Sequence, residues 1–352
     1  MTHHAWKRSV RTMLGVFVAL LAPTIAGAQS SEYTLDDSGD WVQDHVPEPG
    51  SDEAVMADAT ALLAADQPSA AYRVIDRWIS DHDHTNNKWL ARAYLLHGDA
   101  LLAMGDELEA MTDYERQIIQ KRPQSDEFVT AIERELDIAE RYAHGLRRKF
   151  LGLRIVKSGD IAEETFIRVQ ERLPGSALAE RAAIDLSDYY YDAGNLTMAA
   201  TAYDLYVANF PSGPNIERAM ERRIRTNVAL YKGPQYDGSS LIDAREQTRA
   251  FERLFPAQAE KTALDERLVR RLDDALADQM LAGAQWYLKR RDQPSARFML
   301  KRLLQRHPNS PAAADALNLI VEYGWAMPTL QTPDSPESVE PTDSSPTGEH
   351  PS

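Results

Sequence analysis

The stretch SALAERAAIDLSDYYYDAGNLTMAATAYDLYVANFPSG, residues 176–213, decides the fold of this 352-residue chain. Its apolar residues recur every three or four positions, as they do along one face of an α-helix. The pattern is interrupted at Asp192-Ala193-Gly194-Asn195 and stops at Phe210-Pro211-Ser212-Gly213. Proline cannot continue a helix, and the serine beside it can cap the next one. The stretch therefore predicts a helix, a short turn, a second helix and a stop.

The same punctuation recurs along the chain. Further proline breaks stand at Pro123, Pro174, Pro256 and Pro308, and further inner turns at 103–106 and 290–293. Regular breaks of one kind indicate internal repeats. Less regular units are expected over 51–81, 126–174 and 215–256. Because alternating β-branched runs are not evident, we predict an all-α domain over residues 51–326, an α-solenoid of about five to six helical hairpins.

These units resemble tetratricopeptide repeats, which are antiparallel helix pairs of 34 residues with small residues where the helices cross. The resemblance assigns packing roles to Gly98, Ala110, Tyr114, Leu186, Ser187, Tyr190, Ala199, Tyr203, Ala284, Tyr287, Ala296 and Leu300. Within the Tyr189-Tyr190-Tyr191 run, the repeat phase puts Tyr190 in the core. It leaves Tyr191, and then Tyr189, as candidates for contact with a ligand.

A narrower resemblance covers roughly residues 51–326. The run GPQYDGSSLIDAREQTRAFERLFP (233–256), a long helix, and AGAQWYLKRRDQPSARFMLKRLLQRHPNSPAAADALNLI (282–320) are similar to the C-terminal half of the outer-membrane β-barrel assembly lipoproteins (BamD-like). This resemblance implies a periplasmic scaffold of about five repeats. Its implied partners are the barrel-assembly pore protein and unfolded outer-membrane proteins.

The two ends of the chain differ from the helical body. Residues 1–28 combine bases, a short apolar run and Ala26-Gly27-Ala28, the pattern of a cleavable signal peptide, with an uncleaved anchor as the alternative. Residues 29–50 are expected to form an extended leader. Residues 327–352 are rich in Pro, Ser, Thr and acids, which predicts a disordered acidic tail. The resembling family carries a lipidated cysteine where this chain has Gln29, so the sequence does not support a lipid tether there.

Composition limits the class of protein. The formal net charge is -15 and there is no cysteine, so thiolate metal sites and disulfides are excluded. An acidic chain lacks the positive footprint that nucleic acid requires, and its membrane association is expected to be peripheral at most. Together with the signal pattern, this predicts an exported protein of the periplasm or the periplasmic face of the outer membrane.

A protein partner is expected in the concave groove that the first helices of stacked repeats form. Tetratricopeptide groove positions fall on Arg92, Leu95, Asp99, Leu102, Arg181, Ile184, Asp188 and Tyr191. Such a mixture can hold a peptide through apolar pockets and charged clamps. The alternative is a solvated concave face without a ligand.

Signs of catalysis are not evident. His82-Asp83-His84 resembles a pair of metal ligands. It lies in a polar segment between two expected helices, however, and the sequence has no further ligands near it at metal-binding spacing. Nucleophile-elbow, zincin, phosphate-loop and dinucleotide signatures are absent from the sequence. We therefore expect neither a catalytic residue nor a metal or cofactor.

The sequence thus predicts a periplasmic protein-binding scaffold in outer-membrane β-barrel assembly. Two alternatives stay open: a cell-envelope or division-type tetratricopeptide adaptor for peptidoglycan-associated proteins, and a helical-repeat enzyme. Two basic patches, 147–149 and 289–291, fit an acidic partner or lipid headgroups. Bases also gather at helix C-termini because of the helix dipole.

Overall fold

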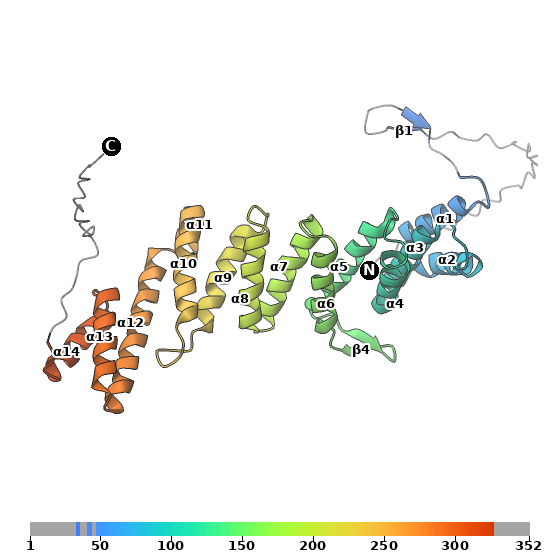
Figure 1. Cartoon of the computed structure of the whole chain (residues 1–352). Helices are drawn as coiled ribbons and strands as arrows, with labels where there is room; N and C mark the ends of the chain where they lie inside the picture. Colours follow the sequence, from blue (N-terminus) through green and yellow to red (C-terminus); the bar gives the residue numbers. More distant parts are fainter. Residues whose placement is uncertain (1–32, 36–40, 44–46, 327–352) are drawn as a thin grey trace, which may run out of the picture. The chain divides into compact units, whose positions relative to one another are not determined.

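The computed structural model describes residues 33–35, 41–43 and 47–326 (Figure 1). The expected signal peptide (1–28) and acidic tail (327–352) lie outside the described residues, as does most of the expected leader. The chain separates into two units between Ala54 and Val55. In the first unit, β1 (Tyr33–Leu35) and β2 (Trp41–Gln43) pair antiparallel, with Tyr33 opposite Gln43. Strand pairing in this segment was not predicted.

As far as residue 326, the second unit is a succession of helices with one β-hairpin between α5 and α6. After α1 (Asp52–Ala64), which crosses the unit boundary, the elements are α2 (Pro68–His82), α3 (Leu90–Ala103), α4 (Glu107–Thr112), the π-helix η1 (Asp113–Ile119), α5 (Glu127–Ala143), β3 (Arg148–Phe150), β4 (Leu153–Val156), α6 (Gly159–Arg172), α7 (Ala177–Asp192), α8 (Leu196–Asn209), α9 (Ile216–Leu230), α10 (Ser239–Leu254), α11 (Pro256–Thr262), α12 (Glu266–Lys289), α13 (Gln293–Arg306) and α14 (Pro311–Glu322).

Helices that are neighbours in sequence are neighbours in space. From α5 to α10 each helix packs against the one before it, and Figure 1 shows them side by side in chain order. The long helix α12 contacts α10 on one side and α13 and α14 on the other. Contacts restricted to adjacent units are the hallmark of a solenoid. The prediction of an all-α, tetratricopeptide-type solenoid is therefore confirmed.

The predicted breaks coincide with helix ends. η1, α6, α8, α10 and α13 each end a few residues before a proline. The inner turns at 103–106, 192–195 and 290–293 separate paired helices. The expected serine caps are formed at Ser176 and Ser310, whose hydroxyls accept from the amides of Ala179 and Ala313 at 3.1 and 3.2 Å. Ser125 and Ser212 do not cap, because α5 and α9 begin after Asp126 and Asn215.

The β3–β4 hairpin is the main departure from the predicted pattern. The sequence predicts a less regular helical unit over 126–174 and no strands, but β3 and β4 connect the two helices of that unit. The strands contain three and four residues and join through Leu151-Gly152, both with positive φ. Strands this short offer too few alternating positions to produce a recognisable period of two.

Candidate protein-binding surface

Two of the residues predicted to bind a ligand instead join one repeat to the next. Asp99 on α3 accepts hydrogen bonds from the Tyr114 hydroxyl on η1 at 2.8 Å and from Nε of Arg134 on α5 at 3.0 Å. The tyrosine stands 15 residues after the aspartate, and the arginine 35 residues after it. The link therefore spans both helices of one repeat and the first helix of the following repeat.

The same link recurs at Asp188 on α7. Its carboxylate accepts from the Tyr203 hydroxyl at 2.5 Å and from Nη1 of Arg222 at 2.9 Å, and it also pairs with Arg218. The sequence separations are 15 for the tyrosine and 34 for Arg222. Burial, followed by the hydrogen bond to Asp188, raises the pKa of Tyr203 far above its ordinary value, so the phenol remains a donor. The contacts of Asp188 therefore hold neighbouring helices together.

The remaining predicted groove positions form no continuous open surface. Leu95 and Ile184 are only 2% and 3% exposed, because they belong to the hydrophobic core. Arg181 pairs with Asp137 and Glu140 on α5. The ring of Tyr191 lies under the Arg222 guanidinium, 5.2 Å from its carbon atom. Arg92 and Leu102 are half-buried. The prediction that Leu95 and Ile184 contact a ligand is wrong, because both side chains are buried in the core.

The residues assigned to repeat packing lie where helices meet. Buried members of this set are Gly98, Ala110, Tyr114, Leu186, Ser187, Tyr190, Ala199, Tyr203, Ala284, Ala296 and Leu300. Tyr287 is half-buried. Tyr190 donates a hydrogen bond of 2.7 Å to Glu163 on α6, whereas Tyr189 and Tyr191 are half-buried.

A better candidate for a binding surface is an apolar groove formed by α6, α7 and α8. Its volume is about 360 Å³. The residues that line it are Ile167, Gln170, Glu171, Leu186, Tyr190, Met198, Thr201, Ala202 and Leu205. Leu186 and Tyr190 come from the central helix α7, while Ile167, Met198 and Leu205 are exposed large apolar side chains on the flanking helices. An exposed apolar groove with a polar rim is typical of a site for another molecule.

The sequence of α8 contains a pattern that indicates this groove. Helix α8 has two parallel apolar stripes, each with spacings of four and three residues. Ala199, Tyr203 and Tyr206 form the buried stripe. The second stripe, displaced by one residue, consists of Met198, Ala202 and Leu205, and it lines the groove. A helix with a single core-facing side needs only one stripe, so the second one marks a surface that meets something else.

The groove lies inside a region that matches a known family. The profile of the family described as YfiO, outer membrane lipoprotein, matches residues 153–334, just over half of the chain. The chain belongs to the YfiO family. A solved structure of the C-terminal part of a TPR repeat-containing protein from Cytophaga hutchinsonii is also similar, with 16% identity over 77% of this chain and 89% of that chain, and a TM-score of 0.40.

Membership of the YfiO family agrees with the predicted resemblance and with a place in the cell envelope. The region matched by the family profile begins at β4 and contains the helices α6 to α14. Among residues 33–35, 41–43 and 47–326 of this YfiO-family chain, no helix has the length and apolar character needed to cross a membrane.

In the His82-Asp83-His84 run of this YfiO-family protein, His82 and Asp83 make local contacts. His82 hydrogen-bonds to the Trp78 carbonyl oxygen at 2.8 Å and its ring stacks on Trp78, and Asp83 accepts from Tyr94 at 2.5 Å. In the part of the chain that the structure describes, groups of three or more His, Asp or Glu suited to a metal ion are not found.

Proposed function

We propose that this chain is a periplasmic protein-binding scaffold in outer-membrane β-barrel assembly, and that its α6–α7–α8 groove holds an apolar segment of a partner polypeptide. The observation that carries the proposal is the groove itself, which lies within the region matched by an outer membrane lipoprotein family. The proposed partner is the barrel-assembly pore protein, with unfolded outer-membrane proteins as further clients.

The chemistry of the groove suits a peptide. Its floor and walls are apolar, and its volume is at the small end of the range for ligand pockets, enough for a few side chains but not for a folded domain. Glu171, Gln170 and Thr201 provide polar groups that can meet a peptide backbone or a basic side chain. An amphipathic segment that places apolar residues at three- and four-residue spacing meets these requirements.

The test is affinity capture with the full-length chain as bait from detergent-solubilised envelope. Leu205, 57% exposed, is replaced in a Leu205→Asp variant, which puts a charge into the groove without disturbing the buried stripe of α8. The matched control is Val321→Asp on α14, another exposed apolar residue, outside the groove. We expect the native chain and the control to recover the barrel-assembly pore protein. We expect Leu205→Asp to recover at least about tenfold less of it, which corresponds to a loss of about 1.4 kcal/mol in binding free energy.

The site of contact is tested separately with a photo-crosslinking residue at position 205. A cross-link from position 205, but not from 321, to the pore protein supports the groove. Equal capture by all three proteins argues against the groove as the binding site. Recovery of peptidoglycan-associated or division proteins in place of the pore protein moves the function to the adaptor class.

A further inference from the structure

The β3–β4 hairpin exposes an unusual amount of apolar surface. Leu151, Leu153 and Ile155 are 88%, 65% and 52% exposed, although they lie within five residues of one another. Side chains alternate between the two faces of a strand, so Leu153 and Ile155 point to the same side of β4, away from the helices. These three residues are called the apolar tip below.

The backbone of the turn is a second reason to assign a role to the exposed Leu151 side chain. Leu151 has φ +50° and Gly152 φ +80°, the conformation of a two-residue turn in which both residues are left-handed. Asn, Asp or Gly adopt this conformation most easily, and they are also compatible with water. A leucine at the first turn position is unfavourable for the backbone and for solvation alike, which points to a use for the side chain.

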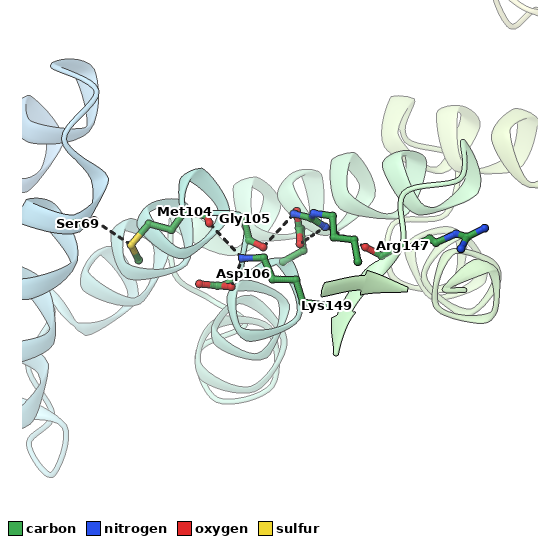
Figure 2. A network of polar contacts seen from close by, with 8 residues as sticks. Ser69, Met104, Gly105, Asp106, Arg147 and Lys149 are labelled. Atoms are coloured by element: carbon green, nitrogen blue, oxygen red, sulfur yellow. Dashed lines mark hydrogen bonds and ion pairs between the residues drawn. The ribbon is translucent and has the colours of Figure 1, made fainter. Parts of the chain in front are cut away.

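The base of the hairpin is fixed to the preceding repeat (Figure 2). Nζ of Lys149 lies 2.6 Å from Asp106 in the α3–α4 turn, and Arg154 forms two hydrogen bonds with Glu107, of 2.7 and 3.1 Å. Arg154 also donates to the carbonyl oxygens of Gly105 and Arg147, at 3.1 Å each. The buried Glu107 makes this attachment specific. The network therefore presents the apolar tip on a fixed base.

The segment that contains the hairpin has a charge opposite to that of the whole chain. Residues 145–158 contain five bases and no acid, within a chain of net charge -15. Lys149 and Arg154 are neutralised by the α3–α4 turn. Arg147 and Lys157 are exposed, and Figure 2 shows the Arg147 side chain directed away from the network. Positive charge thus remains at the base of the hairpin, where Arg147 and Lys157 flank the Arg148–Val156 pair.

We propose that the β3–β4 hairpin is a membrane-contacting element, which inserts Leu151, Leu153 and Ile155 into the interface of a bilayer containing anionic phospholipid. Apolar side chains toward the turn of the hairpin and exposed bases at its base match the two layers of such an interface, acyl chains below and anionic headgroups above. This surface is separate in sequence from the α6–α7–α8 groove, so the inference does not depend on the proposed function.

The first test is flotation of the full-length chain with vesicles of phosphatidylethanolamine and phosphatidylglycerol, and with vesicles of phosphatidylcholine alone. We expect the native chain to float with the anionic vesicles, and less so as salt rises. A Leu151→Asn, Leu153→Thr, Ile155→Thr variant is expected to lose about tenfold or more of this binding, because apolar insertion supplies most of it. An Arg147→Gln, Lys157→Gln variant is expected to lose the preference for anionic vesicles.

The matched control for flotation is a Leu254→Gln, Phe298→Gln, Val321→Gln variant, which removes three exposed apolar side chains elsewhere and is expected to float like the native chain. Native protein that stays unbound with both vesicle types, or a tip variant that floats as well as the native chain, overturns the proposal. So does a tip variant that keeps flotation but loses capture of a protein partner, since the hairpin then docks on protein.

A second measurement does not depend on loss of binding. Because the sequence has no cysteine, Leu151→Cys and Val321→Cys each provide one attachment point for an environment-sensitive fluorophore. We expect a blue shift and stronger emission on anionic vesicles for the label at 151, and little change for the label at 321. A label at 151 that reports only water in the presence of bound vesicles contradicts insertion.

Discussion

The ring of Tyr114 fills the space that a side chain at Gly98 needs. A Cβ atom added to Gly98 on α3 would lie 2.5 Å from Cε1 and 2.8 Å from Cζ of the Tyr114 ring. Tyr114 is itself fully buried and hydrogen-bonded to Asp99, so the ring has no room to move aside. The small residue at position 98 is therefore set by contact with one named ring.

A Gly98→Ala substitution is expected to destabilise the protein by about 1–3 kcal/mol, because it overpacks this helix crossing. Gly283→Ala on α12 is the control, since its Cβ meets only the flexible end of Met299, at 3.3 Å. Alanine is the better helix former, so the control is expected to be neutral or about 0.5–1 kcal/mol more stable. Denaturant unfolding measures both. Equal effects at the two positions contradict the steric explanation.

The Asp188 link leads to a second prediction. Asp188→Ala leaves Tyr203, Arg218 and Arg222 without their shared acceptor, and is expected to cost about 1.5–3 kcal/mol, the range for hydrogen bonds to a charged group. Asp204→Ala is the comparison. Asp204 also pairs with an arginine, Arg223 at 2.6 Å, but is half exposed, so about 0–1 kcal/mol is expected.

The outcome of this pair of variants can be read in thermal unfolding. A small loss at Asp188, no larger than that at Asp204, contradicts a structural role for the link. The same reasoning makes charge reversal at Asp188 a poor probe of ligand binding. Such a variant places a third positive charge beside Arg218 and Arg222 and disturbs the repeat interface directly.

Helix ends were predictable because their chemistry is local. Proline cannot continue the interior of a helix, so α6 and α13 end before Pro174 and Pro308, and a serine hydroxyl reaches the backbone amide three residues later. The Asp188 link was not predictable from spacing. The repeat phase assigns Asp188 to a groove position, where the sequence predicts contact with a ligand. The residue that buries it, Arg222, comes from the following repeat, and spacing within one repeat does not show which charge lies opposite.

The groove and the hairpin were missed for different reasons. The second stripe of α8, which includes Met198 and Leu205, is present in the sequence, but it lies only one residue away from the core stripe and is not separated from it by the three- and four-residue spacing alone. The β3–β4 hairpin is attached through Arg154 to Glu107, 47 residues earlier, and long-range contacts of this kind leave no local pattern.

The serine caps provide a third prediction. Ser176→Ala and Ser310→Ala each remove a formed cap and are expected to cost about 1 kcal/mol. Ser125→Ala is the contrasting variant. Among the described residues its buried hydroxyl has no hydrogen-bond partner, so its removal is expected to leave stability unchanged or higher. Unfolding midpoints of the three variants test this order, and a loss at Ser125 as large as at Ser176 contradicts it.

The fourth prediction concerns pH. Glu135 on α5 is fully buried beside Glu115, and Arg172 on α6 approaches both carboxylates. Arg172 forms two short hydrogen bonds with Glu115, of 2.6 and 2.8 Å, but its nearest atom is 3.5 Å from Glu135. Burial, followed by repulsion from Glu115, raises the pKa of Glu135 to about 8. The carboxyl is therefore protonated in the folded protein at neutral pH.

The sign of the effect on stability follows from proton binding. The unfolded chain releases the Glu135 proton near pH 4.5, whereas the folded protein holds it until about pH 8. The contribution of Glu135 to folding is therefore fully present below pH 4.5 and is lost as pH rises to 8, with a slope of at most about 1.4 kcal/mol per pH unit. Glu135→Gln keeps the shape of the neutral acid, so the variant is expected to unfold with a flatter pH dependence over this window. Its stability relative to the native protein should increase from pH 5 to pH 8. Urea unfolding of both proteins at several pH values gives this difference, and a difference that does not change with pH shows that Glu135 does not hold its proton on folding.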